Sequence, residues 1–198
     1  MAGINEFRTY TNTPKRRNTF YNYCTTRFIQ DQAIFFLLVE AFHESRSKRQ
    51  AAFLNDWFIQ GNIPQDLSET GYIGIVNISS DLQKTISANT NNAISAVGRT
   101  FSAKMTNHGG GVGGFFGALR QKMGETTVTA DLFNTAQSQV VTMLDDGGRH
   151  GFGGVGGVGA TYNSNGAYQP LGSFSALVVH FRKELKAGGF EPDKVGIY

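Results

Sequence analysis

The chain is divided by two glycine-rich runs, HGGGVGGFFG at residues 108–117 and GGRHGFGGVGGVG at residues 147–159. Glycine loses more backbone entropy on ordering than any other residue, so a monomer gains little from two such runs. Glycine also lets another backbone, a phosphate or a neighbouring subunit approach closely. The runs also contain Val and Phe, which a flexible Gly/Ser linker lacks. Two interpretations stay open: the runs are mobile loops, or they become ordered when a partner packs on them.

The composition of the 198-residue chain favours association. Charged residues make up 17% and there are 16 Phe, whereas about a quarter of the residues of a soluble domain are charged. Asn, Thr, Ser, Gln and Gly replace the missing charges. A surface of this kind promotes contacts between molecules. The formal net charge of +3 permits contact with nucleic acid but does not demonstrate it.

Several classes of protein are disfavoured. A single cysteine, Cys24, excludes an intrachain disulfide framework, and we expect it to be a small buried residue in a reducing compartment. No apolar signal run precedes Lys15. The longest apolar run, residues 33–42, is about half the length needed to span a bilayer.

Helical spacing of apolar residues predicts a mainly α fold. The predicted helices are residues 26–45, 47–60, 80–105, 129–144 and 173–187, and residues 71–78 form a predicted short strand. The first helix has an apolar face so wide that we expect burial on more than one side. Glycine at 61, at 147–148 and at 188–189 is expected to end three of the helices. The expected architecture is an antiparallel helix bundle with a short strand element, long Gly-rich loops and extended termini.

The predicted organisation has three parts. Residues 1–23 form a basic extended arm, since Pro14 is expected to break any helix there. Residues 24–187 form the helical-bundle domain, with Gly-rich loops at 108–117 and 147–166, and residues 188–198 form a tail. The arm either lies on phosphates or on a neighbouring subunit, with Tyr21 and Tyr23 able to stack, or is a solvated terminus.

Catalytic chemistry finds little support in the sequence. The pattern Gly-x-Gly-x-x-Gly occurs at Gly109 and at Gly151, but neither copy follows a convincing strand, as a dinucleotide site requires. The four His residues lack metal-ligand spacing. No nucleophile–base arrangement is recognisable. We therefore expect no enzyme activity, no cofactor, no metal and no small-molecule substrate.

The order of elements resembles the coat proteins of rod-shaped, tobamovirus-type plant viruses. The resemblance rests on residues 55–58 (Asn-Asp-Trp-Phe), the predicted strand, Asn77 and Asp81 before the third helix, Gly98-Arg99, and residues 147–152 after the helix at 130–144. It covers roughly residues 26–152. The chain departs from that family in its glycine-rich loop at 109–117, its additional C-terminal helix and its longer, more basic N-terminal segment.

The resemblance implies a four-helix bundle that stacks in many copies around RNA, within a virion assembled in the host cytoplasm. RNA would lie at the end of the third helix and the start of the fourth. The expected phosphate contacts are Arg99 and Lys104, then Arg120 and Lys122, together with Lys15, Arg16 and Arg17 of the basic segment. The expected subunit contacts are Phe115, Phe116 and Phe152.

Two other functions stay open. Residues 113–119 (Gly-Gly-Phe-Phe-Gly-Ala-Leu) are apolar, with glycine beside aromatic residues, as in membrane-active peptides. Arg120 and Lys122 follow at once, which suits a segment that lies on a membrane surface. The third alternative is a nucleotide-binding module built on a glycine-rich loop.

Overall fold

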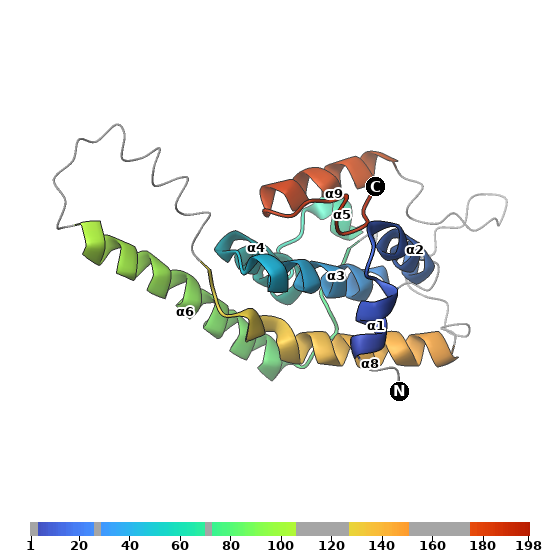
Figure 1. Cartoon of the computed structure of the whole chain (residues 1–198), viewed down its shortest axis with the longest axis horizontal. Coiled ribbons are helices and arrows are strands. Elements are labelled where there is room, and N and C mark those ends of the chain that lie inside the picture. Colours follow the sequence, from blue (N-terminus) through green and yellow to red (C-terminus); the bar gives the residue numbers. More distant parts are fainter. Residues whose placement is uncertain (1–3, 26–28, 70–72, 106–126, 151–174) are drawn as a thin grey trace.

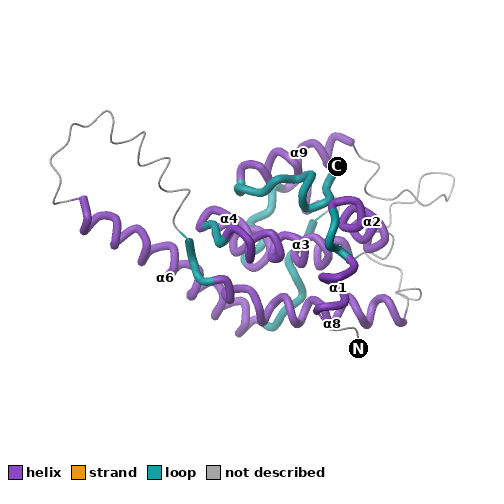
Figure 2. Tube along the Cα trace, viewed as in Figure 1, coloured by secondary structure: helices purple, strands orange, loops and turns teal. Residues whose placement is uncertain are grey.

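The structure is a computed structural model that describes residues 4–25, 29–69, 73–105, 127–150 and 175–198. Within these ranges the chain has eight α-helices and no strand, which confirms the mainly α fold class (Figure 2). For residues 96–105 and 145–150, at the ends of two helices, only the backbone is described.

Helix α3 (Gln30–Ser45) is the centre of the body (Figure 1). It contacts α2 (Pro14–Thr25), α4 (Lys48–Leu54) and α8 (Asn134–His150). Phe35, Phe36 and Phe42 are each 0% exposed. The wide apolar face predicted for this helix is therefore buried by neighbours on several sides, as expected.

The helix after α3 changes its hydrogen bonding midway. α4 continues directly into a π-helical segment, η1 (Asn55–Ile59), in which the amide of Gln60 donates to the carbonyl of Asn55 at 2.9 Å. Gly61, with φ +79°, follows as the sequence predicted. The indole of Trp57 stacks on Phe53 with 4.6 Å between ring centroids.

The prediction of an extended N-terminal arm is wrong for the described residues. Helix α1 (Ile4–Tyr10) and α2 occupy this region, and Pro14 is the first residue of α2. Proline is favourable there because the first turn of a helix leaves its N–H groups without helical partners. The ring centroid of Phe36 lies 5.8 Å from that of Phe7 and 6.3 Å from that of Phe20, so both helices belong to the core.

The predicted strand is also wrong for the part that is described. Residues 73–79 are irregular, and the short helix α5 (Gln65–Glu69) precedes them. The amide of Val76 donates to the carbonyl of Phe58 at 3.0 Å, and Val76 is 1% exposed. Ile73, Val76 and Ile78 of this segment are therefore buried without pairing in a sheet, whereas Ile75 is 47% exposed.

The predicted end is wrong for helix α8 and confirmed for helix α9. α8 runs through Gly147 and Gly148 to His150, beyond the predicted end at 144. Glycine costs a helix about 1 kcal/mol per residue, and that cost alone does not end one. α9 (Ser175–Ala187) does end at the predicted glycines, with Gly189 at φ +86°.

The predicted C-terminal tail is packed against the body. Phe190, Val195 and Ile197 are 3%, 1% and 1% exposed. Gly196 has φ +85°, and a Cβ atom there would lie 2.6 Å from the backbone nitrogen of Asn18. The end of the chain therefore lies directly on α2.

Helix α6 (Ser80–Met105) has the bounds that the sequence predicted. Its 26 residues correspond to about 39 Å at the usual rise per residue. Its first part contacts η1 and the 3-10 segment η2 (Ala130–Phe133). Its second part projects beyond the other helices along the long axis of the molecule (Figure 1).

Candidate nucleic-acid interface

The start of α6 is fixed to the body by a small polar contact. The hydroxyl of Ser87 donates to Oδ1 of Asn55 at 2.9 Å, and Asn55 is 4% exposed. Asn55 is the first residue of the π-helical segment, a feature that often marks a functional position in a helix. Ile86 and Thr90 are the only buried side chains described between positions 80 and 95 of α6. The helix is therefore held along one narrow edge.

The projecting part of α6 carries two of the predicted phosphate contacts. The backbones of Arg99 and Lys104 belong to this part of the helix, and their side chains lie outside the described residues. Arg120 and Lys122, the predicted subunit contacts Phe115, Phe116 and Phe152, and the Gly-rich run at 108–117 also lie outside them. Residues 151–166 of the second predicted loop do so as well.

The three N-terminal cations differ from one another. Lys15 and Arg16 are exposed on α2, and Nη1 of Arg16 is 3.3 Å from Oδ1 of Asn12. Arg17 is half-buried, and its guanidinium donates to the carbonyls of Thr11 at 2.8 Å and Lys194 at 2.7 Å. Arg17 therefore ties the C-terminal turn to α2, a role that the sequence did not indicate.

Two of the helices that carry predicted cations, α2 and α6, lie apart. α2, with Lys15 and Arg16, lies at one end of the long axis, whereas the projecting part of α6 lies at the other (Figure 1). Tyr21 is 4% exposed and cannot stack on a base, while Tyr23 is 44% exposed. A nucleic acid running past the end of α6 would therefore not touch α2 of the same subunit.

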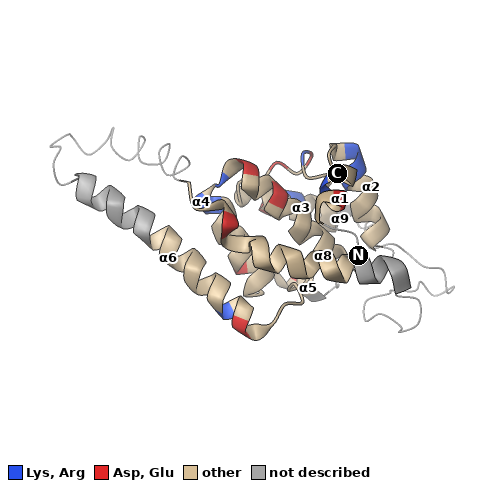
Figure 3. Ribbon diagram, turned by 60° about the horizontal axis from the view of Figure 1, so that its bottom comes forward, with Lys and Arg blue, Asp and Glu red and all other residues tan. Residues whose placement is uncertain are grey.

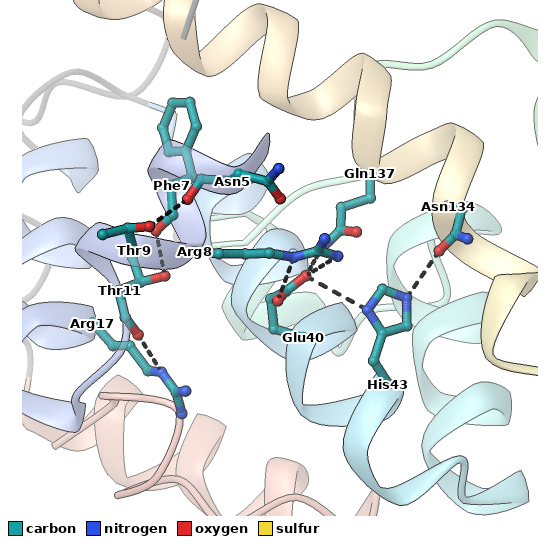
Figure 4. A network of polar contacts seen from close by, with 10 residues as sticks. All are labelled: Asn5, Phe7, Arg8, Thr9, Thr11, Arg17, Glu40, His43, Asn134 and Gln137. Atoms are coloured by element: carbon teal, nitrogen blue, oxygen red, sulfur yellow. Dashed lines mark hydrogen bonds and ion pairs between the residues drawn. The ribbon is translucent and has the colours of Figure 1, made fainter. Parts of the chain in front are cut away.

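A half-buried carboxylate organises the polar contacts of the body (Figure 4). Glu40 of α3 accepts two hydrogen bonds from the guanidinium of Arg8, at 2.9 and 3.0 Å, and one from Nε2 of Gln137 at 2.6 Å. Nδ1 of His43 lies 3.5 Å from the same carboxylate, and its Nε2 lies 3.0 Å from Oδ1 of Asn134. This cluster joins α1, α3 and the start of α8.

Hydrogen bonding sets the charge state of Glu40. Burial alone would raise the pKa of Glu40, but hydrogen bonds from His43, Arg8 and Gln137 outweigh it and lower the pKa to about 2. Glu40 therefore stays ionised at neutral pH. We expect the stability that this pKa shift provides to be present at neutral pH and to be lost as the pH falls from about 4.5 toward 2.

The pKa of Asp31, at the other end of α3, is shifted in the opposite direction. Burial raises its pKa to about 6, against the lowering effect of hydrogen bonds from Gln32 and from its own backbone N–H. Burial also raises the pKa of the nearby Cys24 thiol, to which the charge of Asp31 adds. Cys24 is 1% exposed, so the expectation of a buried cysteine is confirmed.

Two further findings concern other kinds of site. Within the described ranges, no three His, Cys, Asp or Glu side chains come together as a metal site would require. None of the helices in the same ranges is long and apolar enough to span a bilayer. Residues 113–119 of the membrane alternative lie outside them.

Comparison with protein-family models, with curated proteins and with solved structures finds no match. The resemblance to tobamovirus-type coat proteins therefore stays a prediction from the sequence.

Proposed function

We propose that this chain is a structural subunit, of the viral coat or nucleocapsid type, that self-assembles in many copies and coats nucleic acid, with RNA the expected polymer. In this proposal α3, α4, α6 and α8 form the antiparallel bundle predicted from the sequence. The projecting part of α6 brings Arg99 and Lys104 to phosphates, and Arg120 and Lys122 follow in the next segment. The particle, a virion assembled in the host cytoplasm, is part of the same proposal.

The observation that carries the proposal is the position of α6. Between residues 80 and 95 of this 26-residue helix, most side chains are exposed or only half-buried among the described residues. The backbones of Arg99 and Lys104 belong to the part of α6 that projects beyond the other helices (Figure 1). An assembly gives such a helix both neighbours and a polymer to contact, because cations placed at a shared surface attract a phosphate backbone without reading its sequence.

The test is a nuclease-protection experiment on the assembled fraction. The full chain is purified, treated with nuclease, and examined by ultraviolet absorbance ratio and negative-stain microscopy. We expect regular particles that retain protected nucleic acid in the wild type. The double variant Arg99→Gln/Lys104→Gln should lose most of that nucleic acid, and the binding that remains should fall less steeply with salt, because fewer cations release counterions from the phosphates.

The matched control removes the same charge elsewhere. Lys183 and Lys186 are exposed on α9, away from the end of α6. Lys183→Gln/Lys186→Gln should retain nucleic acid as the wild type does. A wild type that remains a monomer at high concentration and holds no nucleic acid would overturn the proposal. Equal losses in the two double variants would show that only overall charge matters.

A further inference from the structure

One broad surface of the body is free of charge. From Thr85 to Ser95 of α6 and from Asn134 to Thr142 of α8 no residue is charged, although many of these side chains are exposed. In Figure 3 the parts of α6 and α8 that are not grey are tan, apart from the charged residues Asp81 and Lys84 at the start of α6. Exposed protein surfaces ordinarily carry roughly 25–35% charged residues. The absence of charge on two neighbouring helices therefore needs an explanation.

This surface, here called the α6/α8 face, comprises Thr85, Asn89 and Asn92 of α6 with Thr135 and Ser138 of α8. An open groove of about 330 Å³ lies between α6 and η2 and reaches Thr135 at the start of α8, and all of these residues except Ser138 line it. Half-buried Leu82, Ala93 and Leu132 supply apolar lining. The charges nearby are the carboxylate of Asp131 and, at the start of α6, the ion pair of Lys84 with Asp81 at 3.8 Å.

The chemistry of the face suits contact with an identical molecule. An amide or hydroxyl side chain both donates and accepts hydrogen bonds, whereas a charged side chain repels its own kind. The side chains of Asn89 and Asn92 form no hydrogen bond with other described residues, so their amides are available to a partner. A phosphate backbone or another strongly charged partner would find no opposite charge among the five residues.

We propose that the α6/α8 face is the surface on which a second copy of this chain docks. This inference rests on the proposed function, because it names a contact through which the subunits associate. Depletion of charged residues is the usual mark of the buried part of a protein–protein interface. The groove between α6 and η2 gives the neighbouring copy a recess lined by polar side chains together with Leu82, Ala93 and Leu132.

Charges of both signs test this proposal. The triple variants Asn89→Glu/Asn92→Glu/Thr135→Glu and Asn89→Lys/Asn92→Lys/Thr135→Lys are compared with the wild type by sedimentation velocity and negative-stain microscopy. We expect both variants to lose at least tenfold in assembled fraction, because either sign would be desolvated without a partner when a neutral surface packs on it. If nucleic acid lies on this face instead, the Lys variant should assemble normally or better, and the proposal is overturned.

The control variant carries charges at exposed positions outside the face. Ala52 and Asn77 are exposed and do not line the groove, so Ala52→Glu/Asn77→Glu should assemble as the wild type does. Circular dichroism and the fluorescence of Trp57 check folding. If a triple variant unfolds, the single variants Asn92→Glu and Asn92→Lys give the same comparison.

The outcomes separate this inference from the proposed function. A wild type that never assembles removes the proposed function and with it this contact. A wild type that assembles, with both triple variants assembling equally well, overturns the α6/α8 contact and leaves the proposed function in place.

Discussion

Helices α3 and α6 are packed in opposite ways. Ten of the 16 residues of α3 are buried, whereas Ile86 and Thr90 alone are buried among the described side chains of α6. Phenylalanines from α1, α2 and η2 contact the aromatic residues of α3. α6 is held mainly by its contacts with η1, α4 and η2.

The difference follows from the two apolar patterns. α3 carries a nearly continuous run from Ala33 to Val39, so every side of the helix needs cover. α6 carries a narrow stripe with Asn, Thr and Ser between the apolar positions, so one edge is enough to bury it. A helix of the first kind holds a subunit together. A helix of the second kind has surface left over for a partner.

α3 and α6 also differ in the charged side chains that they carry. Glu40 of α3 and Arg182 of α9 lie in ion pairs with Arg8 and Asp193, at 2.9 and 2.8 Å. The exposed surface of α6 from Thr85 to Ser95 avoids charge altogether. Ion pairs therefore join neighbouring elements within one copy, and we expect the uncharged surface of α6 to favour contacts between copies.

The largest expected effect comes from the centre of α3. Phe36 is 0% exposed and contacts both Phe7 and Phe20. Phe36→Ala should lower the free energy of unfolding by about 3–5 kcal/mol, because it leaves a cavity and removes the contacts that hold α1 and α2. Urea denaturation followed by the fluorescence of Trp57, the one tryptophan in the chain, measures the change.

The control for this variant is Val179→Ala on α9, since Val179 is 66% exposed. It should change stability by less than about 0.5 kcal/mol. If the two variants behave alike, α1 and α2 are not part of the cooperative core, and the contrast between α3 and α6 is weaker than the packing indicates.

The sequence predicts helices well where a wide apolar stripe repeats. α3 and α9 have such stripes, α6 has a narrower one that still repeats over its length, and the glycines at 61 and 188–189 mark real helix ends. The N-terminal helices were missed because Pro14 was interpreted as a helix breaker. Phe20 and Cys24, four residues apart and both buried, were the available indication of a helix there.

The polar contacts could not be predicted in the same way. Glu40 meets Arg8 and Gln137, which lie 32 and 97 residues away in the sequence. Such pairs depend on how helices are arranged in space, and no local spacing encodes that arrangement. The partners of Arg17 are backbone carbonyls, so residue types gave no indication of its role in holding the C-terminal turn.

A substitution at Asp31 on α3 is expected to have an intermediate effect, and to increase the free energy of unfolding. The pKa of Asp31 is about 6 in the folded chain, against 3.8 for an ordinary Asp. The folded state therefore binds this proton more tightly than the unfolded state, and stability is lost as the pH rises from about 4 to 6. Asp31→Asn should raise the free energy of unfolding at pH 7.5 by up to about 3 kcal/mol, and by little at pH 4.

Urea titrations at the two pH values measure this difference, in which the contribution of Glu40 cancels. Asp81→Asn is the control, because the side chain of Asp81 is 94% exposed and should show no such pH-dependent gain. A loss of stability at pH 7.5 in Asp31→Asn would show that the ionised carboxylate has a stabilising partner.

The smallest expected effect lies on the buried edge of α6. Thr90 is 0% exposed, and its hydroxyl has no hydrogen-bond partner among the described residues. Valine has the same shape and a similar helix propensity, so Thr90→Val removes an unpaired polar group without leaving a cavity. The free energy of unfolding should rise by about 0.5–1 kcal/mol in urea titrations. Thr85→Val, at an exposed position where the hydroxyl donates to the carbonyl of Asp81 at 2.8 Å, should give no gain.

The sign of the Thr90 result matters more than its size. A gain means that α6 is attached to its own subunit less tightly than its length would allow, which fits a helix whose remaining stability comes from a neighbouring copy. In that case Thr90→Val should also shift the monomer–assembly balance little, because Thr90 faces inward and the α6/α8 face is unchanged. A loss of stability would mean that the hydroxyl is satisfied and that the inner edge of α6 is as well packed as α3, which would remove the contrast between the two helices.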